Sequence, residues 1–242
     1  DATDRHPTHA RLVSQYEELA RSHGTLSDRV DALGKAWQLA PSSLGPLEEG
    51  YELAKDSDPA LAEELLKRSL EVGDGEGTRV RPWALERLSE LRANAGDAVG
   101  ALSLLRDAAR AEDPDAARPL YERLAKQAAL AQDYVMAVET YETLREMDAS
   151  DPDIWEPLAE LYRTTQQRTK LLALLEAVTP DIVSPEARAA LSIERVRILQ
   201  ALGQTSDDDL VRALEAVLED DPTATEAAAQ LSELYRTRGG GD

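Results

Sequence analysis

Residues 113–178 read DPDAARPLYERLAKQAALAQDYVMAVETYETLREMDASDPDIWEPLAELYRTTQQRTKLLALLEAV, and this stretch contains the same order of features twice. Each copy begins with Asp-Pro, at Asp113-Pro114 and again at Asp151-Pro152. An amphipathic segment, a short polar break and a second amphipathic segment follow in each copy. The two Asp-Pro pairs are 38 residues apart, which is the length of a helical hairpin with its connections. Because one hairpin cannot bury its apolar face alone, this period predicts a stack of helical hairpins.

The composition agrees with an all-α protein. Hydrophobic residues make up 42% of the 242 residues, whereas only 4% are aromatic and Phe is absent. The core must therefore consist mainly of Leu and Ala, which have high helix propensities. No run approaches the roughly 20 apolar residues of a membrane span. The composition predicts helices packed closely through small side chains.

The charge and the lack of cysteine narrow the classes of partner. A formal net charge of −20 disfavours binding to nucleic acid, whose phosphates require a basic face, and to anionic membranes. A basic protein surface remains a possible partner, attracted over long range. The other interpretation of the charge is the solubility of a long, exposed helical array. Without Cys, neither disulfides nor thiolate metal sites can form.

The apolar pattern predicts helices along nearly the whole chain, both inside and outside the repeated stretch. They are expected at 8–23, 27–40, 46–56, from 59, at 81–95 and 97–112, four times within 113–178, at 185–202, from 207 and from 222. The expected organisation is a loose lead-in at 1–7, N-terminal helical repeats at 8–72, a Gly-rich loop or hinge at 73–78, C-terminal repeats at 79–237 and a flexible tail at 238–242. Residues 73–78 are a poor phosphate-binding loop, because two acids are present and the Gly-Lys-Ser/Thr ending is missing.

Four Asp-Pro pairs predict helix starts. They occur at Asp58-Pro59, Asp113-Pro114, Asp151-Pro152 and Asp221-Pro222. Asp at the N-cap accepts a hydrogen bond from a free backbone N–H, and Pro at the first helical position has the required φ and needs no donor. We expect each pair to begin a helix in this way.

With these residues placed, the chain resembles the tetratricopeptide repeat (TPR) family, whose repeat has 34 residues. The family places a large residue at position 4, Leu at 7, a small residue at 8, Tyr or Leu at 11, Ala at 20, a large residue at 24 and Ala at 27. Segments 42–72 and 184–237 fit this pattern only loosely. The residues at the corresponding positions are Tyr16, Leu19, Ala20, Ala32, Ala36 and Leu39 in the repeat from Val13; Leu85, Leu88, Ser89, Ala101, Leu105 and Ala108 in the repeat from Pro82; Tyr121, Leu124, Ala125, Ala137, Tyr141 and Leu144 in the repeat from Arg118; and Trp155, Leu158, Ala159 and Tyr162 in the repeat from Pro152. The last repeat then departs from the pattern, since Leu171 replaces the Ala at position 20, and Leu175 and Val178 follow.

The resemblance implies a right-handed α-solenoid of about six antiparallel helix pairs, with the first helix of each pair lining a concave groove. In the family, positions 2, 5, 6, 9, 12 and 13 of that helix face the groove. Here they correspond to Trp83, Glu86, Arg87, Glu90, Asn94, Glu122, Arg123, Lys126, Asp153, Glu156, Glu160 and Arg163. The Lys and Asn pattern with which chaperone-binding members hold a C-terminal carboxylate is not reproduced. A peptide could still bind through charge-assisted hydrogen bonds, and the alternative is that these Glu and Arg residues pair with one another.

No motif in the sequence points to catalysis, to a metal or to a cofactor. His6, His9 and His23 lie near the N-terminus, with Pro7 between the first two and no evident third ligand. Neither a His-Glu-x-x-His motif nor a Gly-x-Ser-x-Gly motif occurs. Among 47 acidic residues no carboxylate pair stands out as a general acid and base.

These observations predict a non-catalytic scaffold that binds a peptide or a protein partner in the groove. The alternative is a helical segment that regulates or positions an enzyme or receptor domain elsewhere in a larger chain. The lack of an initiator Met and the glycine-rich tail suggest such a fragment or a processed chain. The Ala- and Arg-rich composition suggests a bacterial source, and a soluble, cytoplasmic protein is favoured; the oligomeric state is open.

Overall fold

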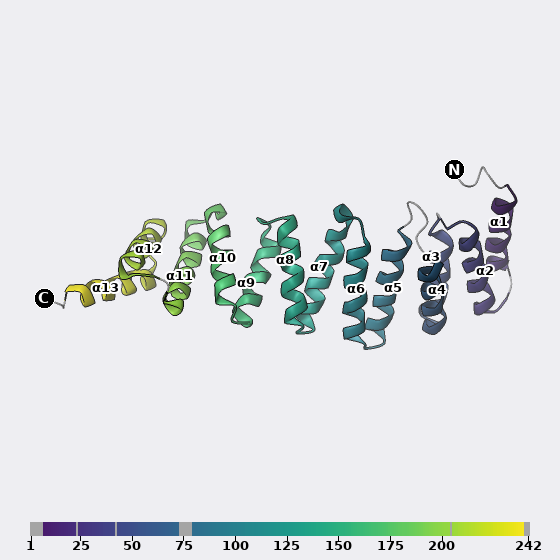
Figure 1. The fold of residues 1–242 in the computed structure, drawn as a ribbon, viewed down its shortest axis with the longest axis horizontal. Coiled ribbons are helices and arrows are strands. Elements are labelled where there is room, and N and C mark those ends of the chain that lie inside the picture. Colours follow the sequence, from purple (N-terminus) through teal and green to yellow (C-terminus); the bar gives the residue numbers. More distant parts are fainter. Residues whose placement is uncertain (1–6, 23, 42, 73–78, 204, 240–242) are drawn as a thin grey trace. The chain divides into compact units, whose positions relative to one another are not determined.

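The computed structural model describes residues 7–22, 24–41, 43–72, 79–203 and 205–239 (Figure 1). Thirteen α-helices and one short 3-10 helix account for the regular structure of these residues, and no strand occurs among them. The prediction of an all-α protein is confirmed. The expected lead-in and hinge, at 1–7 and 73–78, lie outside the described residues except for Pro7, which begins the first helix.

The chain forms two compact units, residues 1–133 and 134–242, which are described separately. Unit 1 contains α1 (Pro7–Ser22), α2 (Leu26–Leu39), α3 (Gly45–Ala54), α4 (Pro59–Val72), α5 (Val80–Asn94), α6 (Ala98–Ala111) and α7 (Pro114–Leu130). Unit 2 contains α8 (Tyr134–Met147), α9 (Pro152–Thr164), α10 (Arg168–Val178), the 3-10 helix η2 (Thr179–Asp181), α11 (Pro185–Leu202), α12 (Asp207–Asp220) and α13 (Thr225–Gly239).

Within each unit, consecutive helices pack against each other and lie side by side (Figure 1). In unit 1 the contacts run from α1 to α7 in chain order, with a further contact between α2 and α4. In unit 2 they run in the same way from α8 to α13. Such nearest-neighbour packing of helical hairpins defines an α-solenoid, so the predicted fold class is confirmed. The right-handed superhelix stays a prediction.

The predicted small residues of the repeats are buried where helices meet. Ala20, Ser89, Ala125 and Ala159, all at repeat position 8, are each at most 4% exposed. Side chains this small allow neighbouring helices to approach closely, and larger residues fill the remaining space. Leu19, at repeat position 7, departs from the pattern because it is 52% exposed. In α1 the side chain that is buried is the next one, Ala20.

One apolar cluster in unit 1 includes residues from both sides of the expected hinge at 73–78. Leu47, Ala62 and Leu66 precede this segment, and Ala84 and Leu88 follow it, within the same cluster. The helices α4 and α5 are also in contact. The two flanking helices therefore belong to one unit, whose boundary lies at residues 133 and 134.

The turns between paired helices repeat the same backbone geometry. Gly96, Gln132 and Gln166 adopt left-handed conformations with φ of 81°, 60° and 56°. In each turn the N–H of the next residue donates to a carbonyl five residues earlier, as from Asp97 to Arg92. This is the Schellman arrangement, which satisfies carbonyls at the end of a helix. The predicted polar breaks are confirmed as turns.

The Asp-Pro pairs do not all act in the expected way. The carboxylates of Asp58 and Asp151 accept hydrogen bonds from the N–H groups of Leu61 and Asp153, at 3.1 and 2.9 Å. Asp113 makes no such side-chain bond at the start of α7. The expectation at Asp221-Pro222 is wrong, because the Asp221 carboxylate binds the N–H and hydroxyl of Thr223 in a turn. This turn delays the last helix until Thr225.

Candidate interaction surface

Three alternate helices of unit 1, α3, α5 and α7, are connected by side-chain contacts on one face. Tyr51 of α3 contacts Trp83 and Glu90 of α5. Arg123 of α7 forms ion pairs with Glu86 and Glu90 of α5. We call the surface formed by these side chains, together with Glu52, Lys55 and Arg87, the odd-helix face. It contains five of the predicted groove residues, and these five lie close together.

An aromatic pair joins α3 to α5 on this face. The ring centroids of Tyr51 and Trp83 are 6.1 Å apart, and the rings meet edge to face at 79°. Trp83 is partly buried and packs against the main apolar cluster of unit 1. Lys55 and the Arg87 guanidinium each lie 6.0 Å from the centre of the Tyr51 ring. Trp83 thus has both a packing role and partial access to solvent.

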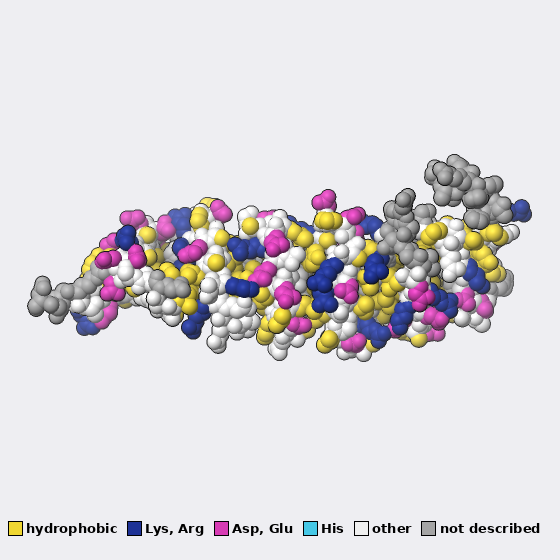
Figure 2. Space-filling view, viewed as in Figure 1, with side chains coloured by type: hydrophobic (Ala, Val, Ile, Leu, Met, Phe, Trp, Pro, Cys, Tyr) yellow, Lys and Arg dark blue, Asp and Glu magenta, His cyan; other side chains and the backbone are white. Residues whose placement is uncertain are grey.

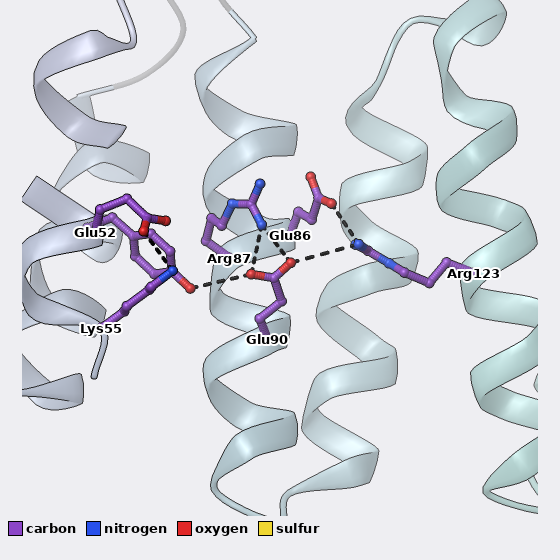
Figure 3. A network of polar contacts seen from close by, with 7 residues as sticks. Glu52, Lys55, Glu86, Arg87, Glu90 and Arg123 are labelled. Atoms are coloured by element: carbon purple, nitrogen blue, oxygen red, sulfur yellow. Dashed lines mark hydrogen bonds and ion pairs between the residues drawn. The ribbon is translucent and has the colours of Figure 1, made fainter. Parts of the chain in front are cut away.

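The charged side chains of the odd-helix face are paired with one another (Figure 3). Arg87 donates two hydrogen bonds to Glu90, at 2.6 and 2.8 Å, and Arg123 lies 2.8 Å from Glu86. The Tyr51 hydroxyl donates to Glu90 at 3.4 Å. Ion pairs of this partly exposed kind stabilise a fold by about 0–1 kcal/mol each. Replacing one of these ion pairs by an ion pair with a partner's charged group therefore costs little free energy.

Burial has a clear effect on Tyr51. Burial of the phenol, together with the negative charge of Glu90, raises the pKa of Tyr51 to about 12. The hydroxyl is therefore protonated at physiological pH and remains a hydrogen-bond donor. Glu90 in turn accepts from Tyr51 and from Arg87 at the centre of the network.

The remaining predicted groove residues of unit 1 are Asn94, Glu122 and Lys126. Asn94 is exposed at the end of α5, and Lys126 is exposed on α7. Glu122 accepts a hydrogen bond of 2.8 Å from Arg118 within the same helix. For Lys126 no ion pair is found among the described residues. The structure does not bring these three side chains into the network.

The predicted residues of unit 2 form a separate, shorter surface. Asp153, Glu156 and Glu160 are exposed on α9. Arg163 binds both carboxylate oxygens of Glu194 on α11, at 2.7 and 2.8 Å, and also contacts Glu160 at 3.1 Å. The hydrogen bonds to Glu194 raise the pKa of Arg163 further above its usual range. Arg163 is thus held by its own chain, as the alternative interpretation of the groove expected.

The same arrangement continues beyond the predicted residues. Arg197 of α11 forms an ion pair with Glu226 of α13, so that α9, α11 and α13 are linked in sequence by Arg–Glu pairs. The repeat pattern could not select these residues, because 184–237 fit it only loosely. Tyr51 and Lys55 on α3 were missed for the same reason. The only signal for them was their aromatic and basic character within the helix expected at 46–56.

A second polar cluster of unit 2 lies among α8, α9 and α10. Glu142 accepts hydrogen bonds from Lys170 and from the Tyr162 hydroxyl, both at 2.7 Å. Burial of the phenol and its bond to Glu142 raise the pKa of Tyr162. Burial opposes ionisation of Glu142, but the bonds from Lys170 and Tyr162 outweigh it and lower the pKa of Glu142. All three groups are satisfied by one another.

Two of the three tryptophans belong to the buried core. Trp37 is 1% exposed and Trp155 is 7% exposed. Of the histidines, His6 and His23 lie outside the described residues, and the side chain of His9 is not described either. Among the described residues no group of three or more His, Cys, Asp or Glu side chains is placed to hold a metal ion. In that same part of the chain, no helix combines the length and the apolar character needed to cross a bilayer.

Basic and acidic side chains are interspersed over each unit on the face seen in Figure 2. No large area of a single charge is visible there, despite the net charge of −20. On this face, charge is therefore distributed in small groups of both signs.

No protein-family model matches the sequence, and no curated protein matches it. Among solved structures, that of Naa15/Naa10 bound to HypK-THB is similar over 94% of this chain and 39% of the other, with 12% identity and a TM-score of 0.53. YrrB, a TPR protein with an unusual peptide-binding site, is similar over 83% of this chain and 98% of the other, with 14% identity and a TM-score of 0.41. For PilF from Pseudomonas aeruginosa the coverages are 93% and 99%, the identity is 15% and the TM-score is 0.40.

Identities this low concern the fold alone. The chain spans 39% of the length of the protein with the highest TM-score of these three. The similarity to the Naa15/Naa10 structure, together with the buried small residues and the stacked helix pairs, supports a TPR-like fold for the chain.

Proposed function

We propose that the chain is a non-catalytic protein-interaction scaffold and that the odd-helix face of unit 1 binds a peptide or protein partner. The observation that carries this proposal is the meeting of three alternate helices on one face, where Trp83 and Tyr51 lie beside Arg87, Glu90 and Arg123. Aromatic and Arg side chains are the residues that most often dominate binding energy at protein interfaces.

The paired charges determine how such a partner would bind. Arg123 and Glu86 each remain partly exposed, at 34% and 22% of their side-chain surface. A partner carboxylate can replace Glu86 on Arg123, and a partner Lys or Arg can replace Arg123 on Glu86. Because each exchange replaces an existing ion pair, the polar groups provide orientation, while the apolar contact with Trp83 provides most of the affinity.

Peptide selection followed by charge reversal tests this proposal. Peptides are selected from a random display library on the wild-type chain, and their dissociation constants are measured by fluorescence anisotropy. We expect Arg123→Glu to raise the dissociation constants of the selected peptides by about tenfold or more. The change removes two ion pairs and places three carboxylates together. Arg163→Glu tests the surface of unit 2 in the same way.

Arg212→Glu is the matched control. Like Arg123, Arg212 forms an ion pair with an acidic residue. Its partner is Asp209, three positions earlier in the same helix, and Arg212 is exposed on α12. Its reversal changes the net charge by the same amount without touching the odd-helix face. Equal affinity for wild type, Arg123→Glu and Arg212→Glu would contradict the assignment of the site, and failure to select any peptide would contradict peptide binding itself.

A further inference from the structure

Helix α11 buries few side chains for its length. Three of its 18 residues, Ala189, Val196 and Ile198, are buried. In comparison, α9 buries six of 13 residues, α10 five of 11 and α12 four of 14. Ala189 and Val196 belong to an apolar cluster that also contains residues of α12 and α13. Because stabilisation by apolar packing grows with the area buried, α11 gains less from it per residue than α9, α10 and α12 do.

Ion pairs connect α11 to four other helices of unit 2. Each pair joins a charged side chain of α11 to an oppositely charged side chain of α9, α10, α12 or α13. The pairs are Glu194 with Arg163, Arg195 with Glu176, Arg188 with Asp220, and Arg197 with Glu226. The contacts that fix α11 among its neighbours are therefore in good part electrostatic.

Three of these four pairs have the geometry in which an ion pair is strongest. The guanidinium groups of Arg163, Arg188 and Arg197 each donate two hydrogen bonds, one to each oxygen of the partner carboxylate. The bonds from Nε are 2.7, 2.8 and 2.6 Å long. Arg188 also donates to the carbonyl of Ile182, in the segment that precedes α11. Such bidentate pairs are stronger and more specific in geometry than single contacts.

Dissolved ions can reach these pairs. The side chains of the three bidentate pairs are between 23% and 57% exposed. The distance over which charges act falls from about 10 Å at 0.1 M salt to about 3 Å at 1 M. The pair of Arg87 with Glu90 on α5 is exposed to a similar extent, but α5 also buries seven residues. Screening therefore removes a larger share of the stabilisation of α11 than of α5.

We propose that α11 is a salt-sensitive element of unit 2, which opens locally at ionic strengths at which α9 and α5 remain packed. Salt weakens the ion pairs of α11, and the few buried side chains do not hold the helix in place without them. When α11 opens, Arg163 loses its bidentate partner Glu194 and becomes accessible. This property belongs to unit 2 and does not depend on the function proposed for the odd-helix face.

Hydrogen exchange of the full chain, measured by mass spectrometry at 0.05 and 1 M NaCl, tests the proposal. We expect the amides of α11 to exchange about fivefold faster at the higher salt concentration, whereas those of α9 and α5 should change by about twofold or less. All helices are compared within one sample, so any effect of salt on the exchange chemistry itself cancels. An equal change in the three helices would overturn the proposal, and so would unchanged exchange of α11.

Two neighbouring acids of α12 provide matched variants. Asp220 forms the bidentate pair with Arg188, whereas Glu219 is exposed and has no ion pair among the described residues. Asp220→Asn should speed the exchange of α11 at 0.05 M NaCl and reduce the further effect of salt on this helix. Glu219→Gln removes the same charge and should leave both quantities as in the wild type.

A second variant addresses the other side of α11. Glu194→Gln removes the carboxylate that binds Arg163 and should have the same effect as Asp220→Asn. If Asp220→Asn and Glu194→Gln exchanged like Glu219→Gln at both salt concentrations, the ion pairs would not hold α11 and the proposal would be wrong.

Discussion

Two of the turns hold a non-glycine residue in the left-handed conformation, which lowers the stability of the fold locally. Gln132 and Gln166 are 34 residues apart and occupy the position at which the equivalent turn has Gly96. A side chain in this conformation costs roughly 1–2 kcal/mol, whereas glycine avoids the cost but gains freedom in the unfolded chain. We expect Gln166→Gly to raise the free energy of unfolding by about 0.5–1 kcal/mol, measured by urea denaturation. The matched change Gln167→Gly, at a position with φ of −82°, should not stabilise the chain. Equal or lower stability of Gln166→Gly would contradict this account.

The helices were largely predictable at the scale of the element, and the binding surface only in part. Polar breaks and Gly or Pro residues mark most helix ends, because they are local features of the chain. The start of the last helix was misplaced, since the Asp221 carboxylate binds Thr223 instead of a helix N–H. The repeat pattern assigned Trp83 and Arg123 to the predicted groove, and in the structure both belong to the odd-helix face. It could not show that Arg123 is already paired, because ion pairs between helices depend on side-chain conformations that a sequence does not specify.

The capping box at the start of α2 makes a prediction about pH. The Asp28 carboxylate accepts hydrogen bonds from the hydroxyl and the N–H of Thr25, and these bonds lower the pKa of Asp28 below its ordinary value of 3.8. A lowered pKa in the folded state means that the ionised group stabilises the fold above pH 3.8, and that this contribution is lost as the pH falls through the folded-state pKa. Asp28→Asn should therefore reduce the urea midpoint at pH 7 and have a smaller effect at pH 3. Glu18→Gln, an exposed change on α1, is the control for altered net charge. A difference between Asp28→Asn and wild type that is the same at both pH values would contradict the role of the charge.

At the scale of the whole molecule, stability should follow the number of buried side chains in each helix. Among the described side chains, α1 and α13 each bury one, Ala20 and Ala227. In contrast, α5 buries seven residues and α9 buries six. In a helical-repeat fold each helix is stabilised mainly by its immediate neighbours, so helices can open locally at different free energies.

Hydrogen exchange measured by mass spectrometry tests this order. We expect the amides of α1 and α13 to exchange well before those of α5 and α9 at pH 7, because opening the first two helices exposes little apolar surface. The Gln166→Gly chain provides an internal reference, since added stability at the turn between α9 and α10 should slow exchange in these two helices and leave α1 unchanged. Uniform exchange of all four helices would mean that the chain opens as a single cooperative unit. In that case the packing between neighbours would extend its effect over the whole chain, and the local counts of buried residues would not determine where the protein opens first.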